Sequence, residues 1–415
     1  MSVTTVPQPY RVPKGHVPLA DPVAQIATCP LGTRYQDYGT KTKRTRRANG
    51  EHRVAITEHL DVDRLAEQAL QGVAMTRDEA LAVLRTPDER LPELLQATFT
   101  VRRRYHGKRV KVCVLQNAKS GLCPEDCGYC SQSAVSKAPI EKYRLLSKEQ
   151  LLDGARRATE AGAKRYCMVT SSRGPTERDI EHFVDAVAAI TQRYPQLELC
   201  VSLGIMDEAK ARRLKAAGVG WINHNLNTSR RFYPAICTTH TYDDRVETVK
   251  NVRAAGLMTC SGGIIGMGET DEDVVELAFT VRALAIDSIP VNFLHAIPGT
   301  PLGDAHEITP TRALKALCLF RLLNPKADIR AAGGREVNLR SMQAMALYAA
   351  NSIFVEGYLT TPGQQAASAH QMIADMGFEV EGADLSPSAP NAAPATEDLR
   401  HGSAISARPP VNASA

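Results

Sequence analysis

The sequence is short of the features that mark a secreted or membrane-bound protein. Aromatic residues make up 5% of the 415 residues, and ten cysteines are too few to staple a chain of this length. No uninterrupted apolar run is long enough to span a membrane. Pro recurs in residues 1–18, where the apolar part of a signal peptide would lie. These absences exclude a disulfide scaffold and predict a cytoplasmic protein with reduced thiols and no membrane partner.

The charge of the chain says little about its partners. The formal net charge is +5, and much of it comes from the run KTKRTRRANGEHR at residues 41–53. This run has no aromatic side chain that could stack on bases, so we expect a solvated segment and no nucleic-acid partner. The hydrophobic content of 43% is enough to form a large buried core.

The chain divides into four predicted regions. Residues 1–60 mix Pro, Gly, Thr and charged residues without periodicity, and residues 382–415 are rich in Pro, Ala and Ser, so both tails are predicted to be disordered. Residues 61–105 are predicted to be helical, with one helix from Asp61 to Val73 and a second that begins at a capping box of Thr76 and Glu79. Residues 106–381 are left for the main folded domain.

The main domain alternates β-rich runs with helical patterns. Ser147 and Gln150 form a capping box for one helix, and residues 241–256 form another that closes on Gly256. Eight strand–helix units predict parallel strands in a (β/α)₈ TIM-type barrel, whose active site lies at the carboxyl ends of the strands. A doubly wound open sheet is the alternative. The predicted strands are residues 110–115, 165–170, 197–203, 221–226, 257–266, 290–296, 328–332 and 352–354.

A triplet of cysteines is the most informative motif. Cys123, Cys127 and Cys130 have the spacing C-x₃-C-x₂-C in the run GLCPEDCGYC. Three thiolates this close can face one point only on a loop, whereas a structural zinc site or an electron-carrier cluster normally has four protein ligands. We therefore predict an iron–sulfur cluster with one iron left open for chemistry. Zinc binding and reduced structural thiols are the alternatives.

Three further cysteines lie on separate predicted strands. A single buried Cys is usually just a small apolar residue, but Cys167, Cys200 and Cys260 occupy comparable places, and a barrel would aim all three at its interior. Arg330, on the seventh predicted strand, keeps its proton and needs an anionic partner inside a barrel. A thiolate-bound [2Fe–2S] cluster is such a partner.

Strand amides and a Gly-rich turn are weaker signals. Asn223, Asn225 and Asn292 lie on predicted strands, where amides are either satisfied structural groups or ligands for a polar substrate. The run SGGIIGMGE at residues 261–269 does not have the dinucleotide-binding spacing but has the form G-x-I-x-G-x-x-E. The remaining thiols fit no spacing and are interpreted as incidental: Cys29, Cys113, Cys237 and Cys318.

Taken together, these motifs resemble the biotin synthase family of radical S-adenosylmethionine (SAM) enzymes. The resemblance runs from about Thr76 to Gly377. It implies a full barrel, usually a homodimer, that inserts sulfur into dethiobiotin with electrons from a flavodoxin- or ferredoxin-type donor. The motifs that carry it are CPEDCGYCSQS (123–133), YCMVTSSRGP (166–175), NHNLNTS (223–229), TTHTYDDR (238–245), CSGGIIGMGET (260–270), NFLHAIPGTPL (292–302) and RAAGGRE (330–336).

The resemblance also implies roles for individual residues. The triplet would bind a [4Fe–4S] cluster whose open iron holds SAM, and the SAM cleaved there would yield the radical that attacks dethiobiotin. A [2Fe–2S] cluster that donates the sulfur would be bound by Cys167, Cys200, Cys260 and Arg330. Dethiobiotin or SAM would contact Asn223, Asn225 and Asn292, and SAM would also contact Tyr129, Gly262, Gly263 and Gly266.

Two departures and two other classes of function stay open. The first 70 or so residues have no counterpart in shorter family members, and Cys167 is followed by MVTSSRGP where some members have CMGAAW. A related radical SAM enzyme, of the methylornithine synthase or hydrogenase maturation type, would share the barrel and the triplet. A non-catalytic iron–sulfur or zinc module is the alternative from another class, and it would have four ligands at each site.

Overall fold

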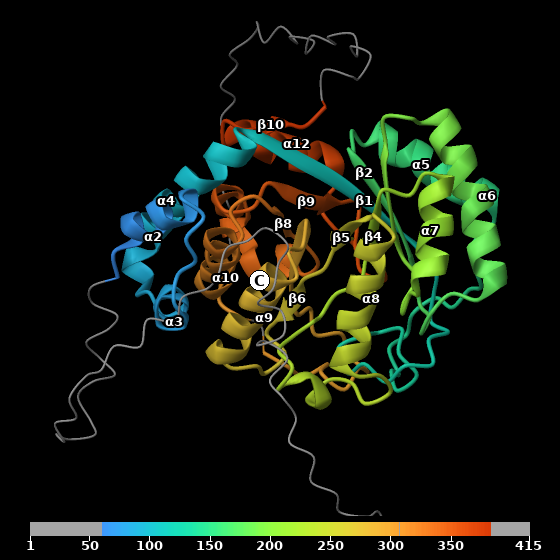
Figure 1. The fold of residues 1–415 in the computed structure, drawn as a ribbon, viewed down its shortest axis with the longest axis horizontal. Coiled ribbons are helices and arrows are strands. Elements are labelled where there is room, and N and C mark those ends of the chain that lie inside the picture. Colours follow the sequence, from blue (N-terminus) through green and yellow to red (C-terminus); the bar gives the residue numbers. More distant parts are fainter. Residues whose placement is uncertain (1–59, 307, 383–415) are drawn as a thin grey trace, which may run out of the picture.

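Eight parallel strands close into a barrel in the computed structural model of the protein, which describes residues 60–306 and 308–382 (Figure 1). The strand order is β1-β2-β3-β4-β5-β7-β8-β9, and β1 pairs with β9 to close the ring. This order confirms the predicted TIM-type barrel. The strands of the ring are β1 (Arg109–Lys119), β2 (Arg165–Thr170), β3 (Glu198–Ser202), β4 (Trp221–Asn223), β5 (Met258–Cys260), β7 (Ser288–Phe293), β8 (Asp328–Ala331) and β9 (Ser352–Val355).

Besides small shifts of their ends, the strands differ from the sequence prediction in three places. The predicted run 221–226 is a strand only from Trp221 to Asn223, so Asn225 lies beyond its end. The predicted run 257–266 forms two short strands, β5 and β6 (Gly263–Ile265), and β6 pairs with β7. At the break, a Cβ atom added to Gly262 would lie 2.0 Å from the Pro290 carbonyl oxygen, so the close approach of β7 requires glycine there. A two-residue strand, β10 (Glu379–Val380), was not predicted and pairs with the start of β1.

Most of the crossover helices begin at the side-chain caps that their sequences offer. The capping boxes predicted at Thr76 and Ser147 are both present, and Thr176, Thr241 and Thr270 form three more. Between and after the strands of the ring lie α5 (Lys148–Glu160), α6 (Glu177–Arg193), α7 (Glu208–Ala217), η2 (Tyr233–Ala235), α8 (Tyr242–Ala254), α9 (Asp271–Ala283), α10 (Pro310–Leu323), α11 (Arg335–Leu339), η3 (Arg340–Tyr348) and α12 (Ala366–Asp375).

The predicted helical segment before the barrel packs beside α10 (Figure 1). It consists of α2 (Val62–Leu70), α3 (Arg77–Leu84), η1 (Asp88–Arg90) and α4 (Leu91–His106). Because α10 lies between this segment and the barrel, it is buried from Ala313 to Leu323. Apart from Leu60, which is buried, and Gly382, both predicted disordered tails lie outside the described residues. Within the described part of the chain, no helix is long and apolar enough to cross a membrane.

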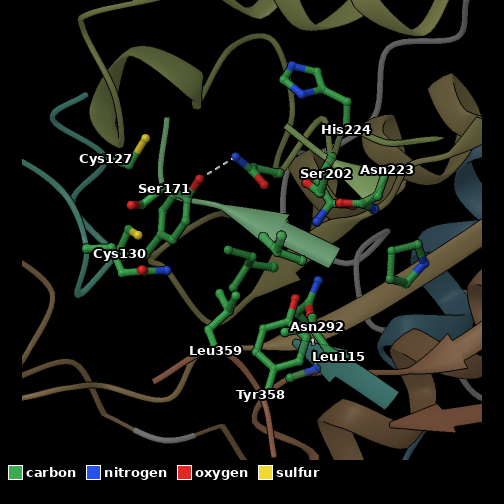
Figure 2. A pocket seen from close by; sticks show the side chains of 18 of the residues that line it. Leu115, Cys127, Cys130, Ser171, Ser202, Asn223, His224, Asn292, Tyr358 and Leu359 are labelled. Carbon is green, nitrogen blue, oxygen red and sulfur yellow. Dashed lines mark hydrogen bonds between the residues drawn. The ribbon is translucent and has the colours of Figure 1, made fainter. Parts of the chain in front are cut away.

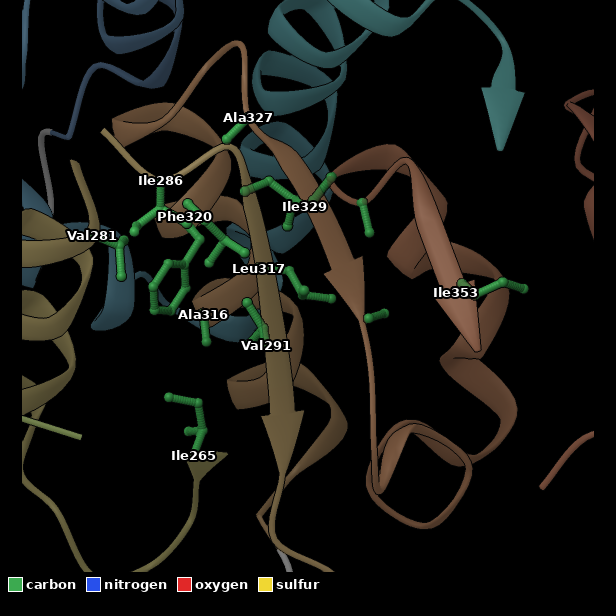
Figure 3. Packing of buried hydrophobic residues seen from close by; sticks show 14 of the residues in the cluster. Ile265, Val281, Ile286, Val291, Ala316, Leu317, Phe320, Ala327, Ile329 and Ile353 are labelled. Atoms are coloured by element: carbon green, nitrogen blue, oxygen red, sulfur yellow. The ribbon is translucent and has the colours of Figure 1, made fainter. Parts of the chain in front are cut away.

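The apolar core lies between the strands and the surrounding helices. Figure 3 shows Val291 of β7 and Ile329 of β8 facing Leu317 and Phe320 of α10, and all four side chains are fully buried. Truncating Phe320 to Ala is expected to cost about 3–5 kcal/mol. This packing fixes the strands from outside, so the barrel interior is free to carry polar and thiol side chains.

Candidate active site

A cavity of about 280 Å³ opens at the carboxyl ends of the strands. The three triplet cysteines and the three strand cysteines all line it, together with Arg330 and the three predicted amides. Figure 2 shows Cys127 and Cys130 on one side of this cavity and Asn223 and Asn292 on the other. The barrel therefore gathers every predicted thiol ligand around one space.

The triplet lies on the long loop between β1 and α5, as its spacing predicted. Burial raises the pKa of Cys123 and raises that of Cys130 to about 11. Cys127 donates a hydrogen bond to Cys237 at an Sγ–Sγ distance of 3.6 Å, which raises the pKa of Cys127 and lowers that of Cys237 to about 4. Three soft thiol donors on one cavity wall fit a [4Fe–4S] cluster with one open iron.

Acidic residues of the loop join it to the segment before α8. Asp126 accepts backbone hydrogen bonds from Thr238 at 2.9 Å and Thr239 at 3.2 Å. Glu125 is buried and forms a short contact with Nδ1 of His240. Burial alone raises the pKa of Glu125, but hydrogen bonds from Thr239 and His240 outweigh it and lower that pKa. These contacts fix the triplet loop over the mouth of the barrel.

The strand thiols lie deeper in the cavity. Cys167 and Cys200 are direct partners in the β2–β3 ladder, and Cys260 lies on β5 with its sulfur 3.8 Å from Nη1 of Arg330. A hydrogen bond with Cys200 lowers the pKa of Cys167 and lowers that of Cys260 to about 5. Burial opposes this shift, and the charge of Arg330 adds to it. Thiols beside a fixed positive charge suit a thiolate-bound [2Fe–2S] cluster.

Buried charges surround the strand thiols. The Asp328 carboxylate lies 3.3 Å from Arg330 and 3.4 Å from Arg165, and Arg165 also pairs with Glu198 at 2.7 Å and stacks on the Trp221 ring. Burial alone lowers the pKa of Arg330, but Cys113 and Asp328 outweigh it and raise that pKa. The interior therefore keeps a charged guanidinium group next to the thiols, as the sequence predicted.

The three amides are partly satisfied by the fold. Nδ2 of Asn223 donates to Oδ1 of Asn225 at 3.1 Å and to the Cys260 sulfur at 3.3 Å. Asn292 bridges two backbone groups, donating to the Gly263 carbonyl and accepting from the Gly333 amide, each at 3.0 Å. Asn292 thus has a structural role, whereas the other two amides keep free polar atoms at the cavity.

The Gly-rich turn packs closely against its neighbours. A Cβ atom on Gly263 would lie 2.3 Å from Leu277 and 2.6 Å from the Asn227 carbonyl oxygen, and Gly266 has a φ of 104°. Glu269 accepts from the amides of Gly266 and Met267 at 2.7 Å. Among the described residues, Ile264 of this turn lines the cavity. The predicted SAM contacts Gly262, Gly263 and Gly266 do not line it.

Several residues near the cavity carried no signal in the sequence. Cys237 contacts Cys127, and Cys113 lies 3.5 Å from the Ser352 hydroxyl that accepts from Nε of Arg330. His224 lines the cavity, and its buried Nε2 has no partner in the described part of the chain. Tyr129 differs from these residues because it is a predicted SAM contact; it lines the cavity, and its hydroxyl accepts a hydrogen bond from Nδ2 of Asn227 at 2.6 Å. For Cys113 and Cys237, a thiol on its own was the only available signal.

Comparisons with known proteins point to one family. The profile of the Radical SAM superfamily matches residues 119–281, and that of the Biotin and Thiamin Synthesis associated domain matches residues 290–379. Biotin synthase of Halalkalibacterium halodurans is 55% identical over 317 residues, which cover 76% of this chain and 95% of that protein. Biotin synthase of Bacillus subtilis strain 168 is 54% identical over 76% of this chain and 94% of its own length.

Solved structures agree on the fold alone. Methylornithine synthase superposes with a TM-score of 0.67 at 21% identity, over 76% of this chain and 97% of that protein. The FeFe-hydrogenase maturase HydG from Carboxydothermus hydrogenoformans superposes with a TM-score of 0.64 at 17% identity, over 77% of this chain and 78% of that protein. These two enzymes are of the types left open by the sequence, and their low identity contrasts with the values above 50% for biotin synthases.

Proposed function

Because this chain belongs to the biotin synthase family of the radical SAM superfamily, we propose that its loop thiols and its strand thiols are the two cluster sites of that family. The protein is a biotin synthase, a SAM-dependent sulfurtransferase that converts dethiobiotin to biotin and uses a [4Fe–4S] and a [2Fe–2S] cluster. The proposal assigns Cys123, Cys127 and Cys130 to the [4Fe–4S] cluster. It assigns the [2Fe–2S] cluster to Cys167, Cys200, Cys260 and Arg330.

One observation supports this assignment most directly. Two separate sets of three thiols line a single cavity, one on a loop and one on barrel strands. A carrier protein has no need of two such sets beside free amide groups, whereas sulfur insertion needs a radical source and a sulfur source within reach of one substrate. When bound, the loop cluster with SAM supplies the radical that removes hydrogen from an unactivated carbon, and the strand cluster supplies the sulfur.

The amides have atoms to spare for a polar ligand. Oδ1 of Asn223 and Nδ2 of Asn225 have no hydrogen-bond partner among residues 60–306 and 308–382, and both side chains line the cavity. A free acceptor and a free donor complement the N–H and C=O groups of the cyclic urea in dethiobiotin. We propose that these two amides orient the substrate, while Tyr129 and the turn around Gly262, Gly263 and Gly266 lie along SAM.

The cavity wall also protects a reactive radical. Leu115, Ile264 and Leu359 contribute apolar surface to the cavity, and the strand thiols at its base are almost fully buried. A saturated carbon offers no acidic proton, so paired carboxylates or a Ser–His pair could not activate it. Excluding water and stray hydrogen donors is therefore the main contribution of these side chains.

Paired cysteine variants test the assignment. Full-length Cys123→Ala and Cys200→Ala are reconstituted anaerobically, and iron, sulfide, 5′-deoxyadenosine and biotin are measured. Cys123→Ala is expected to lose SAM cleavage and biotin together. Cys200→Ala is expected to keep the [4Fe–4S] spectrum and some SAM cleavage while losing biotin. Cys318→Ala, in the fully buried middle of α10, is the matched control and should resemble wild type.

The opposite results would be as clear. Biotin formation by each of the variants Cys167→Ala, Cys200→Ala and Cys260→Ala would mean that the sulfur comes from elsewhere. Stoichiometric zinc in the wild-type protein, or iron for one cluster only, would contradict the two-site assignment. Growth of a biotin-requiring strain that carries this gene and is fed dethiobiotin tests the activity independently of the residues.

We also propose the setting in which the enzyme acts. All nine described cysteines are free thiols, which is consistent with a reducing compartment such as the cytoplasm. A flavodoxin- or ferredoxin-type protein is the expected electron donor, and the exposed side chain of Leu122, next to Cys123 in the sequence, lies beside the loop site that it would reduce. A homodimer is expected, and light scattering of the reconstituted protein tests it.

A further inference from the structure

A second group of metal-binding atoms lies against the triplet loop. Cys237 follows η2, and its sulfur is 3.6 Å from that of Cys127 and 3.3 Å from Nδ1 of His240. The ligand atoms of these three residues all lie within 4.8 Å of one another, and all three residues are buried. Among residues 60–306 and 308–382, no other group of three or more His, Cys, Asp or Glu residues has its ligand atoms this close together.

The spacing of this group suits a single ion. With metal–sulfur bonds of about 2.3 Å and a metal–nitrogen bond of about 2.0 Å, a tetrahedral ion places two sulfurs about 3.8 Å apart and a sulfur and a nitrogen about 3.5 Å apart. The measured distances of 3.6 and 3.3 Å lie close to these values. The ligands of a cubane cluster bind different iron atoms and therefore lie farther apart than the ligands of one ion.

Glu125 provides a fourth ligand from the triplet loop. Its Oε2 contacts Nδ1 of His240, and its carboxylate lines the cavity together with Cys127 and His240. Two sulfurs, one imidazole nitrogen and one carboxylate oxygen form a donor set that zinc and ferrous ions accept. Oε2 of Glu125 and Nδ1 of His240 already touch, so a bound ion requires only a small movement of the two side chains apart.

The surroundings of His240 specify what must change when an ion binds. Nη2 of Arg245 donates to Nε2 of His240 at 2.8 Å, so Nδ1 carries the ring proton and donates it to Glu125. An ion at Nδ1 displaces that proton to Nε2, and Arg245 must then release the ring. Arg245 keeps its bonds to the Tyr233 hydroxyl and, at 2.7 Å, to the Asn225 carbonyl oxygen.

We propose that the cluster-free protein binds one thiophilic divalent cation, of the Zn²⁺ or Fe²⁺ class, at Cys127, Cys237 and His240, with Glu125 completing the site. Cys127 is shared with the proposed [4Fe–4S] site, so the single ion and the complete cluster exclude each other. This exclusion rests on the proposed function, whereas the ion site itself does not. Zinc bound here therefore blocks cluster assembly until it is removed.

Cobalt is a suitable probe because its thiolate bonds are coloured. Cluster-free full-length protein is titrated anaerobically with Co²⁺, and the sulfur-to-cobalt and tetrahedral ligand-field bands are recorded, followed by displacement with Zn²⁺. Wild type is expected to bind one Co²⁺ per chain with both sets of bands. Cys237→Ser should lower the affinity at least about a hundredfold, because losing a direct ligand exceeds the 10–100-fold effect of an outer partner. Cys123→Ser and Cys130→Ser are the matched controls and should bind as wild type does.

The variants separate the possible outcomes. Unchanged cobalt binding by Cys237→Ser and by His240→Gln, each checked for folding by circular dichroism, overturns the inference. A loss of affinity in Cys130→Ser as large as that in Cys237→Ser also overturns it, because Cys130 would then be a ligand and the ion would not be held by the proposed set of residues. A Cys237→Ser protein that loses cobalt yet forms the [4Fe–4S] spectrum, now insensitive to added zinc, supports it.

One result distinguishes this inference from the proposed function. If Cys237→Ser is folded but cannot form the [4Fe–4S] spectrum, Cys237 is itself a cluster ligand. That result overturns the three-ligand assignment of the proposed function, while the cobalt titrations of Cys237→Ser and His240→Gln decide the ion site separately. If Cys123→Ala and Cys130→Ala still form the cluster while Cys237→Ser loses cobalt, the proposed function fails and the ion site stands.

Discussion

The two thiol sites of the cavity are fixed in different ways. The triplet loop is tied to another loop: the Gly128 amide donates to the Ile236 carbonyl at 2.9 Å, and Asp126 accepts from Thr238. The strand thiols are fixed by the barrel itself, where Cys167 and Cys200 are partners in a parallel ladder. We therefore expect the loop site to adjust more than the strand site when a ligand binds, because the strand thiols are held by the ladder of the barrel.

The loop site and the strand site also differ in the burial of the charged groups around them. At the loop site, Asp126 is partly exposed and its partners are backbone amides and hydroxyl groups. At the strand site, Asp328 is buried between the guanidinium groups of Arg165 and Arg330, and among the described residues Glu198 is the other carboxylate that pairs with either of them. Removing a single charge from the strand site should therefore lower the stability more than removing one from the loop site.

The largest predicted difference follows from Asp328→Asn. This change leaves Arg330 and Arg165 buried with one counter-charge fewer, so the free energy of unfolding should fall by about 3–5 kcal/mol. The [2Fe–2S] content should fall while the loop cluster is retained. Denaturant titration and iron and sulfide analysis measure the two effects. Asp271→Asn is the matched control, since Asp271 pairs with Arg85 and Arg312 near the surface and should cost about 1 kcal/mol or less.

Acid should weaken the contribution of Asp328. Burial alone raises the pKa of Asp328, but Arg330 and Arg165 outweigh it and hold the pKa at about 2, below its ordinary value of 3.8. A carboxyl whose pKa is lower in the folded state stabilises the fold above its unfolded pKa, and this contribution is lost as the pH falls through the folded pKa. The stability difference between wild type and Asp328→Asn should therefore shrink by about 2 kcal/mol between about pH 4 and pH 2.

Denaturant titrations of the cluster-free protein at several pH values check this expectation. A stability difference that stays constant from about pH 4 to pH 2 would mean that the pKa of Asp328 is the same in the folded and unfolded states, so that the two guanidinium groups do not stabilise its charge. The strand site would then depend on Glu198, which pairs with Arg165, for its counter-charge.

The same contrast explains what the sequence could and could not predict. The triplet is visible because its ligands are neighbours in the chain, and the strand thiols are visible because each lies within a β-rich run. Cys237 is 110 positions from Cys127, so its place beside the triplet depends on how two loops meet. Cys113 lies within a predicted strand, but only the register of the closed barrel shows that it lies near Arg330. Asp328 was likewise visible only as one residue of a strand.

The loop site should respond less to the loss of its acid. Asp126→Ala removes hydrogen bonds from two backbone amides and two hydroxyl groups at a partly exposed position, so unfolding should become easier by about 1–2 kcal/mol. The [4Fe–4S] cluster should be lost faster under air, while the [2Fe–2S] spectrum is unchanged. Thermal melts and the decay of the cluster absorbance measure this. Equal loss of both clusters would show that the two sites are coupled, which would contradict the view that separate contacts hold each site in place.

The smallest expected effect belongs to Cys113→Ser. Cys113 is fully buried, burial raises its pKa, and its sulfur lies 3.5 Å from the Ser352 hydroxyl. A serine in its place can bond that hydroxyl, and the free energy of unfolding should change by about 1 kcal/mol or less. Iron and sulfide at the strand site should be unchanged, because Cys167, Cys200 and Cys260 remain. If Cys113→Ser instead loses the [2Fe–2S] spectrum and Arg330→Met keeps it, Cys113 is the fourth ligand. The rigid site then holds its cluster with four thiolates, and Arg330 serves only as its counter-charge.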